Sequence, residues 1–226
     1  MVEHFIIEPL SIPWWIGLLS SFLSIALLLF LLRNQSLEIK ERFGKVLAVV
    51  FILVYLITLI TTIKNGTWNI QDHLPLHLCR ISFIICVITL LSKTQWMYEW
   101  CLFLAIPAGF HSLLTPELTN GISNWFFFDF YFVHAGMLLV PLYLTLIMKM
   151  KPRTRAWIHT FYRLQIPVVF IFPLNFIISS NYMYLKDQPS VKNPLVIGEW
   201  PYYILLLELI TLVHIYIIHL IVCKRR

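Results

Sequence analysis

The chain has 226 residues, of which 59% are hydrophobic and 12% charged, and its formal net charge is +6. Soluble domains average roughly 25% charged residues. This composition excludes an ordinary water-soluble globular protein and indicates a membrane protein.

Seven apolar stretches are each long enough to cross a bilayer, which takes about 20 apolar residues in a helix. They cover residues 14–32, 43–63, 73–92, 96–115, 124–148, 157–180 and 200–222. The connections are short, so we expect a single transmembrane domain over residues 1–226 and no soluble domain. Glu3 and Glu8 precede the first stretch, where a signal peptide carries basic residues. The sequence therefore predicts an all-α polytopic protein with seven transmembrane helices.

Lys and Arg are strongly biased to one side of this predicted bundle. Loops 33–45 and 149–156, Lys93 and the tail 224–226 together carry twelve of them. The other side carries three: Lys64, Lys186 and Lys192. Because cytoplasmic loops are enriched in Lys and Arg, we expect the N-terminus outside and the C-terminus in the cytoplasm. The net positive charge then reflects contact with the inner leaflet of a cell membrane, expected to be a bacterial plasma membrane, and not with nucleic acid.

Polar and ionisable residues inside the predicted spans gather in the outward-facing half. Such groups are costly in a bilayer and usually mark a functional site. They come from five spans and are Cys79, Arg80, His111, Asp129, His134, Asn175 and Glu208. We therefore expect one site open to the outer leaflet and not a pore.

The third stretch is predicted to be helical from residue 73, with Asp72 as its N-cap and a proline tolerated in the first turn. Cys79 would then lie roughly 10 Å along the helix. His73, His77 and Arg80 have i, i+4, i+7 spacing and would share one stripe. Since His77 and Cys79 would point apart, a base for this cysteine has to come from another span.

A cysteine activated by a histidine attacks esters and thioesters, because the histidine accepts the thiol proton. Cys79 is the candidate nucleophile. His134 is the preferred base, since it lies about 15 Å into its span, at comparable depth. Asp129 or Glu208 would orient the imidazole as the third group of a triad-like set.

Other polar residues would support this chemistry or have purely structural roles. Arg80, Asn175 or Asn181 would stabilise an oxyanion, or Arg80 would hold a lipid phosphate. Alternatively, Asn175 satisfies carbonyls freed by the nearby Pro173, and Glu208 forms a buried ion pair with Arg80. Residues expected to have no special role are His214, at the inner end of the last span, and Glu99 and Arg163, near the cytoplasmic interface.

No cofactor is predicted. His73 and His77 have the i, i+4 spacing of a metal-binding helix but lack the intervening Glu of an HExxH motif. A haem between His111 and His134 has no specific support.

Four short motifs follow one another from the third to the seventh stretch. They are residues 74–79 (LPLHLC), 113–118 (LLTPEL), 181–185 (NYMYL) and 198–203 (GEWPYY). Together they resemble the YwaF-like family of bacterial integral membrane proteins, relatives of the eukaryotic transmembrane protein 164 family. The match covers roughly residues 70–210, whereas the first two spans match only in hydrophobicity.

This resemblance implies a seven-span fold. From the eukaryotic branch it implies a lipid acyltransferase that moves a fatty acyl group between phospholipids through an acyl-cysteine. Cys79 then corresponds to that cysteine and His134 to its partner. A more distant similarity is to the androgen-induced lipid hydrolases, which use a threonine and a histidine. Glu199 and His111 depart from the family pattern and are expected to affect substrate choice.

The sequence thus predicts a membrane lipid acyltransferase, or lipid ester hydrolase, with Cys79 and His134 as catalytic pair and a phospholipid or lysophospholipid as substrate. The supporting residues are predicted to be His77, Arg80, His111, Asp129, Asn175, Asn181, Tyr182 and Glu208. The main alternative is a transporter or a small-ligand- or lipid-binding protein that uses the same polar cluster. Transporters often contain inverted repeats, and none is evident in this chain. A third hypothesis is a non-catalytic membrane chaperone or assembly factor.

Overall fold

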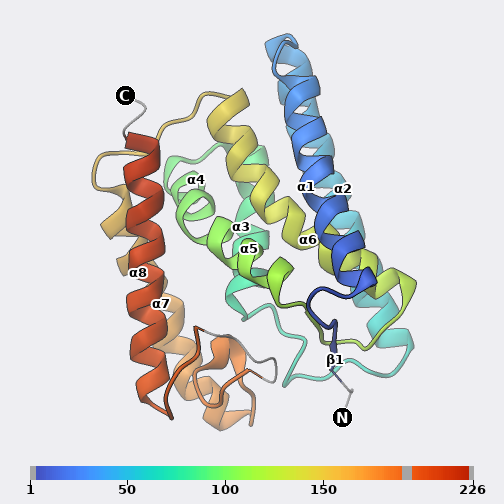
Figure 1. The fold of residues 1–226 in the computed structure, drawn as a ribbon, viewed down its shortest axis with the longest axis vertical. Coiled ribbons are helices and arrows are strands. Elements are labelled where there is room, and N and C mark those ends of the chain that lie inside the picture. Colours follow the sequence, from blue (N-terminus) through green and yellow to red (C-terminus); the bar gives the residue numbers. More distant parts are fainter. Residues whose placement is uncertain (1–3, 190–194, 224–226) are drawn as a thin grey trace.

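A computed structural model of the chain describes residues 4–189 and 195–223, and Figure 1 shows its arrangement as a bundle of helices. The described helices are α1 (Ile12–Leu32), α2 (Leu37–Lys64), α3 (Leu78–Ser92), α4 (Gln95–Trp100), α5 (Ile106–Leu114), α6 (Asn124–Leu142), α7 (Ala156–Ile177) and α8 (Tyr202–Cys223). Two π-helical turns, η1 (Cys101–Ala105) and η2 (Tyr143–Ile147), join α4 to α5 and extend α6. A short 3-10 turn, η3 (Tyr182–Tyr184), follows α7.

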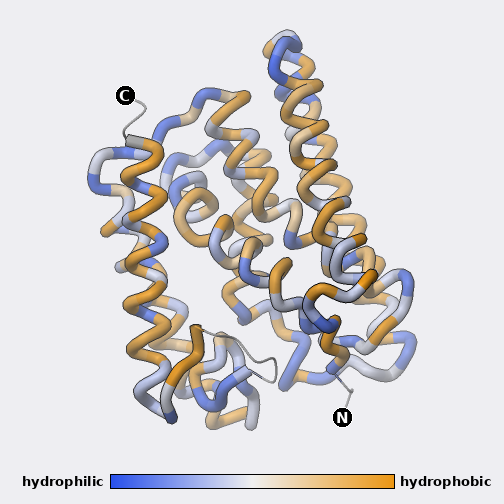
Figure 2. Tube along the Cα trace, in the orientation of Figure 1, coloured by the Kyte–Doolittle hydropathy of each residue, from blue (hydrophilic) through white to orange (hydrophobic). Residues whose placement is uncertain are grey.

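Six helical segments of the described chain are long and apolar enough to cross a membrane. They are Ile12–Leu32, Leu37–Lys64, Gln95–Leu114, Asn124–Ile147, Ala156–Ile177 and Tyr202–Val222. Their apolar surfaces run along the height of the molecule, and hydrophilic residues are concentrated in the connections at its two ends (Figure 2). The protein is therefore an all-α, multi-pass membrane protein, as predicted.

The helix of the third stretch begins later than predicted. It starts at Leu78 with His77 as its N-cap, so the predicted cap at Asp72 and the stripe through His73 and His77 are wrong. The preceding segment has other partners for its backbone: the Tyr182 hydroxyl donates to the Ile70 carbonyl (2.7 Å) and accepts from the Leu74 N–H (2.8 Å). Because a backbone group satisfied by a side chain gains nothing from a helical bond, the chain stays in turns up to residue 77.

The fourth stretch forms one continuous segment but is not a regular α-helix throughout. The π turn Cys101–Ala105 ends two residues before Pro107. A proline has no N–H and its ring clashes with the carbonyl four residues back in an α-helix, and a wider π turn relieves that conflict.

Helix α6 lies against α1, α2, α3 and α5, and its apolar side chains belong to the two larger buried clusters. Its approach to α5 is especially close at Gly109. A Cβ at that position would be 2.9 Å from the backbone oxygen of His134. The absence of a side chain at Gly109 thus lets α5 pack against the part of α6 that carries His134.

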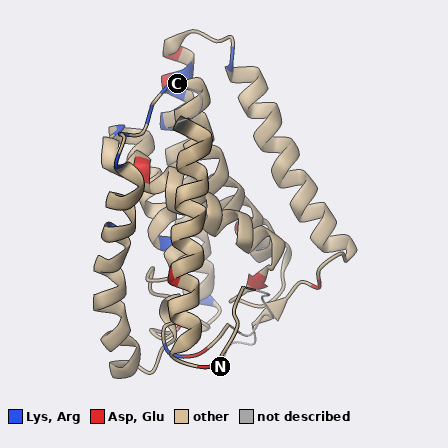
Figure 3. Ribbon diagram, turned by 60° about the vertical axis from the view of Figure 1, so that its left-hand side comes forward, with Lys and Arg blue, Asp and Glu red and all other residues tan. Residues whose placement is uncertain are grey.

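Strand β1 (Phe5–Ile6) pairs antiparallel with β2 (Glu117–Leu118) at one end of the molecule, with Phe5 opposite Leu118. Helix α8 ends at the opposite end, where Lys and Arg are also concentrated (Figures 1 and 3). Lys192 and residues 224–226, which contribute to the predicted charge asymmetry, lie outside the described residues.

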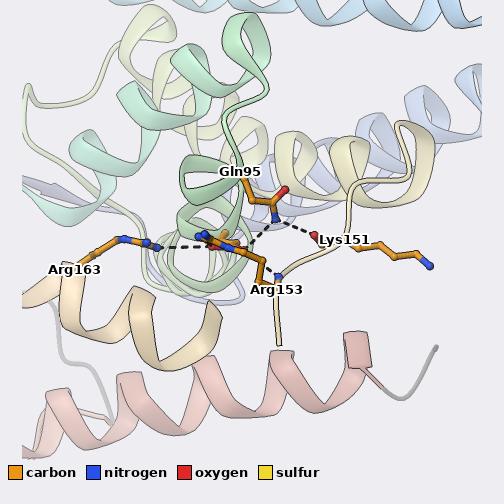
Figure 4. Close-up of polar contacts among 5 residues, drawn as sticks. Gln95, Lys151, Arg153 and Arg163 are labelled. Carbon is orange, nitrogen blue, oxygen red and sulfur yellow. Dashed lines mark hydrogen bonds and ion pairs between the residues drawn. The ribbon is translucent and has the colours of Figure 1, made fainter. Parts of the chain in front are cut away.

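A buried carboxylate joins the basic loop before α7 to α4 (Figure 4). The side chain of Glu99 is fully buried and accepts from the Arg153 backbone N–H (3.0 Å), Nε (2.9 Å) and Nη2 (2.6 Å). Gln95 also donates to it (3.0 Å), and Arg163 lies 3.7 Å away. Glu99 therefore has a structural role that was not expected, because it ties α4 to the loop before α7; the expectation for Arg163 stays a prediction.

Candidate functional site

A cavity of about 550 Å³ lies among α3, α5, α6, α7 and α8, within the size range of small-molecule sites. The segments around residues 71–72, 117–120 and 181–189 also line it. Most predicted site residues line this one space: His77, Cys79, Arg80, His111, Asp129, His134, Asn181 and Glu208. Two predicted site residues, Asn175 and Tyr182, do not belong to its described lining.

Cys79 is the second residue of α3, and no described side chain caps that helix. The backbone N–H groups of the first turn therefore have no helical acceptor and stabilise negative charge placed beside them. The Sγ of Cys79 lies 3.4 Å from the Oγ of Ser112 on α5. Sequence reasoning missed Ser112, because a serine in an apolar helix gives no signal of its own.

The hydrogen bonding of His134 determines which of its nitrogens is available. Its Nδ1 lies 2.7 Å from the Phe130 carbonyl oxygen, one turn earlier in α6. A carbonyl can only accept, so Nδ1 carries the hydrogen, and the neutral ring keeps a lone pair on Nε2. The predicted orientation of this ring by Asp129 or Glu208 is wrong, because a backbone carbonyl performs that task.

The charged residues pair differently from the prediction. Arg80 lies 3.7 Å from Asp129, whereas Glu208 accepts a hydrogen bond from Gln165 on α7 (2.9 Å). The expected ion pair between Arg80 and Glu208 is therefore not formed. Arg80 Nη1 and Asp129 Oδ1 are buried and have no hydrogen-bond partner among the described residues. These two atoms keep unused hydrogen-bonding capacity at the cavity wall.

A pair of histidines joins α5 to α8. The Nε2 atoms of His111 and His214 are 3.2 Å apart, and His214 Nδ1 lies 2.7 Å from the Ile210 carbonyl. His214 therefore donates from Nδ1 and accepts from His111 through Nε2. The prediction that His214 has no special role at the inner end of its span is wrong, because it lines the cavity.

Asn175 has a structural role that neither prediction anticipated. Its Oδ1 accepts from the Tyr182 N–H (2.8 Å) and the Ser180 hydroxyl (2.8 Å), and its Nδ2 donates to the Tyr182 carbonyl (2.9 Å). The side chain thus closes the turn after α7 and contributes no group to the cavity. Asn181 does line the cavity, but its Oδ1 accepts from the N–H groups of Lys186 and Asp187.

The N-terminal segment covers part of the same cavity. His4 Nδ1 lies 2.7 Å from Glu117 Oε1, next to the paired strands β1 and β2, and both residues line the space. The hydrogen bond with Glu117 raises the pKa of His4 above its ordinary value of 6.5. No group of three or more His, Cys, Asp or Glu side chains in the described part of the chain is arranged to hold a metal ion.

The TMEM164 family profile matches residues 8–219. The chain belongs to the TMEM164 family. The match includes every residue predicted for the site and confirms the resemblance to the transmembrane protein 164 family; the relation to a bacterial YwaF-like branch stays a prediction. Comparisons with curated proteins and with solved structures found no significant match.

Proposed function

We propose that this TMEM164 family member is a membrane lipid acyltransferase in which Cys79 is the nucleophile. The observation that supports this most directly is the place of Cys79 at the uncapped start of α3, on the wall of the cavity that also contains His134. Free N–H groups at a helix N-terminus favour negative charge that develops beside them. The same free N–H groups are suited to an oxyanion on a carbonyl bonded to that sulfur.

In the proposed first step, the thiol proton moves to His134 Nε2, directly or through the Ser112 hydroxyl. The Cys79 sulfur attacks the acyl carbonyl carbon of a phospholipid, a C–S bond forms, and the carbonyl π electrons move to oxygen. When the C=O bond re-forms, the ester C–O bond breaks, and the leaving glycerol oxygen takes the proton from His134. The products are an acyl-cysteine and a lysophospholipid.

In the second step, the hydroxyl of a lysophospholipid attacks the thioester and gives its proton to His134. The C–S bond breaks, the sulfur recovers the proton, and a new phospholipid leaves. Attack by water instead would make the protein a lipid hydrolase. A cavity that excludes water therefore favours transfer.

We further propose that residues 1–226 form one transmembrane domain with seven crossings, the N-terminus outside and the C-terminus in the cytoplasm. Helix α3 has 15 residues and spans roughly 22 Å. The turns before it complete the third crossing. The twelve-to-three distribution of Lys and Arg supports the orientation. In this arrangement the cavity opens toward the outer leaflet.

The test is the intact mass of the purified protein after incubation with phosphatidylcholine and phosphatidylethanolamine of defined acyl chains. We expect a fatty-acyl increment, labile to hydroxylamine, on the wild type and on the control Cys86→Ala, whose sulfur is buried beside Cys101 and outside the cavity. Cys79→Ala should carry none. An adduct that survives in Cys79→Ala would refute the assignment of the nucleophile.

The assignment of the base needs a separate comparison, because His111 also lines the cavity and lies next to Ser112. We expect His134→Phe to slow acyl-cysteine formation by roughly 100-fold or more. His111→Phe should have an effect of less than about tenfold. The reverse order would make His111, supported by His214, the base.

A second candidate is a lipid-binding or transport protein. It is favoured by the buried Arg80 Nη1 and Asp129 Oδ1, whose hydrogen-bonding capacity is unused among the described residues. Saturable lipid binding with no adduct in the wild type, and with lipid composition unchanged, would support this candidate over the acyltransferase.

A further inference from the structure

The turn between α7 and α8 holds two consecutive residues in an unusual backbone conformation. Met183 has φ of 57° and Tyr184 has φ of 55°, in the left-handed region that residues with a side chain rarely occupy. Such strain persists only where the surroundings impose it. Here the three hydrogen bonds of Asn175 and the bonds of the Tyr182 hydroxyl to the segment before α3 fix the turn on both sides.

The strained turn presents the ring of Tyr184 to the cavity. The side chain lines the same space as Cys79, and its ring centroid lies 5.4 Å from that of His77. Burial raises the pKa of the phenol, and the nearby Glu117 carboxylate and Cys79 sulfur raise it further. The group therefore stays protonated and is available as a hydrogen-bond donor.

The hydroxyl of Tyr184 also differs from those of four buried tyrosines of the bundle. Tyr98, Tyr143, Tyr182 and Tyr203 each bond their hydroxyl to another part of the protein. Tyr184 is only partly buried, and its hydroxyl makes no hydrogen bond to the described residues. Because the Tyr184 side chain lines the cavity, its hydroxyl is available to a ligand bound there.

We propose that the Tyr184 hydroxyl donates a hydrogen bond to the oxyanion that forms when Cys79 attacks an acyl ester. The inference rests on the proposed acyltransferase function. The uncapped N–H groups of α3 supply donors to the developing charge, and Tyr184 supplies a further donor from the turn between α7 and α8. The phenol keeps its proton throughout, so the atoms transferred in each step are unchanged.

The variant to test is Tyr184→Phe, which keeps the ring and removes only the donor. The matched control is Tyr131→Phe, because the Tyr131 hydroxyl is also unpartnered among the described residues but does not line the cavity. The substrate probe is phosphatidylcholine with a radiolabelled palmitoyl chain in proteoliposomes. The second measurement is the rate of alkylation of Cys79 by iodoacetamide, a direct displacement of iodide, followed by peptide mass spectrometry.

We expect Tyr184→Phe to lower kcat for acyl-cysteine formation by roughly 100-fold, the effect of losing one oxyanion donor, with little change in KM. The alkylation rate should stay within about twofold of the wild type, since that reaction forms no oxyanion. Tyr131→Phe should change neither the kcat for acyl-cysteine formation nor the alkylation rate.

The inference and the function can fail separately. If Cys79→Ala abolishes the acyl adduct while Tyr184→Phe retains wild-type kcat, the acyltransferase stands and the role of Tyr184 is refuted. A parallel fall in alkylation and acylation would also refute it, because Tyr184 would then act on the thiol or on the local structure. Absence of any adduct in the wild type would overturn the function and this inference with it.

Discussion

Substitution of Glu99 by Gln should destabilise the end of the bundle that contains α4 and the loop before α7 far more than the loss of an ordinary surface ion pair. The carboxylate accepts three hydrogen bonds from Arg153, and its side chain has no exposed surface. A carboxamide keeps the volume but turns one acceptor into a donor that faces a guanidinium.

The magnitude follows from the burial of the two partners. Breaking a fully buried charge pair costs about 3–5 kcal/mol. The Arg153 side chain is 55% exposed and regains water when it is released, which reduces the loss. We therefore expect a decrease of about 2–3 kcal/mol in the free energy of unfolding.

The assay is unfolding by SDS in mixed micelles, followed by circular dichroism. The control is Glu41→Gln, which breaks the bond from Lys93 Nζ (2.6 Å) between two well-exposed side chains. This control should have no measurable effect, because exposed pairs contribute little. The double variant Glu99→Gln, Arg153→Gln should lose little more than Glu99→Gln alone, since both remove the same interaction. Equal stability of the Glu99 and Glu41 variants would refute the reasoning.

Three further predictions concern the cavity and its surroundings. Because the folded-state pKa of His4 is raised, its bond to Glu117 stabilises β1 below about pH 6.5 and is lost as the pH rises through the raised value. Hydrogen exchange, corrected for intrinsic rates, should therefore show less protection of β1 at pH 8.5 than at pH 6. His4→Ala should show no such difference. Gly109→Ala should destabilise the protein by about 1–3 kcal/mol and slow acyl transfer, because its Cβ would meet the backbone oxygen of His134; unchanged unfolding and activity would contradict this close packing. Tyr182→Phe leaves two backbone groups without their partner and should cost about 1–3 kcal/mol in the same SDS titration; wild-type stability would contradict its role in the turn before α3.

The long spans could be predicted from the sequence because their signal is local. An apolar stretch of about 20 residues forms a helix in a bilayer wherever its neighbours lie, since no water is present to satisfy its backbone. Helices such as α2 and α7 therefore match the predicted stretches within a few residues at most ends. The start of α3 was wrong because a residue more than 100 positions away, Tyr182, binds the backbone before it.

The sequence predicts most of the residues that line the cavity, but not which of them contact one another. Ionisable residues in a span avoid lipid, so Cys79 and His134 were both expected to face a common interior space. Depth alone cannot say which helices are neighbours, and for that reason the sequence offers Glu208 as one possible partner of Arg80 and does not single out Asp129. His214 was misplaced for a simpler reason: it lies twelve residues after the start of α8, roughly 18 Å into the helix.

Residues that bear hydroxyl groups were the hardest to predict, because Ser and Tyr cause no anomaly in an apolar helix or at an interface. Ser112 and Tyr184 become candidates only when the structure puts them on the wall that contains Cys79. Tyr184 belongs to the motif at residues 181–185, which binds the motif at residues 74–79 through the Tyr182 hydroxyl and the Leu74 N–H.

The contact between these motifs explains why a late helix start and a strained turn occur together. If α3 began at residue 73, the N–H of Cys79 would bond within the helix and would no longer be available at its end. If the turn at 183–184 relaxed, the ring of Tyr184 would lose the conformation that directs it into the cavity. The Tyr182 side chain stabilises both features at once. The bundle provides the helices, and this single contact between distant parts of the sequence positions the groups that the proposed chemistry needs.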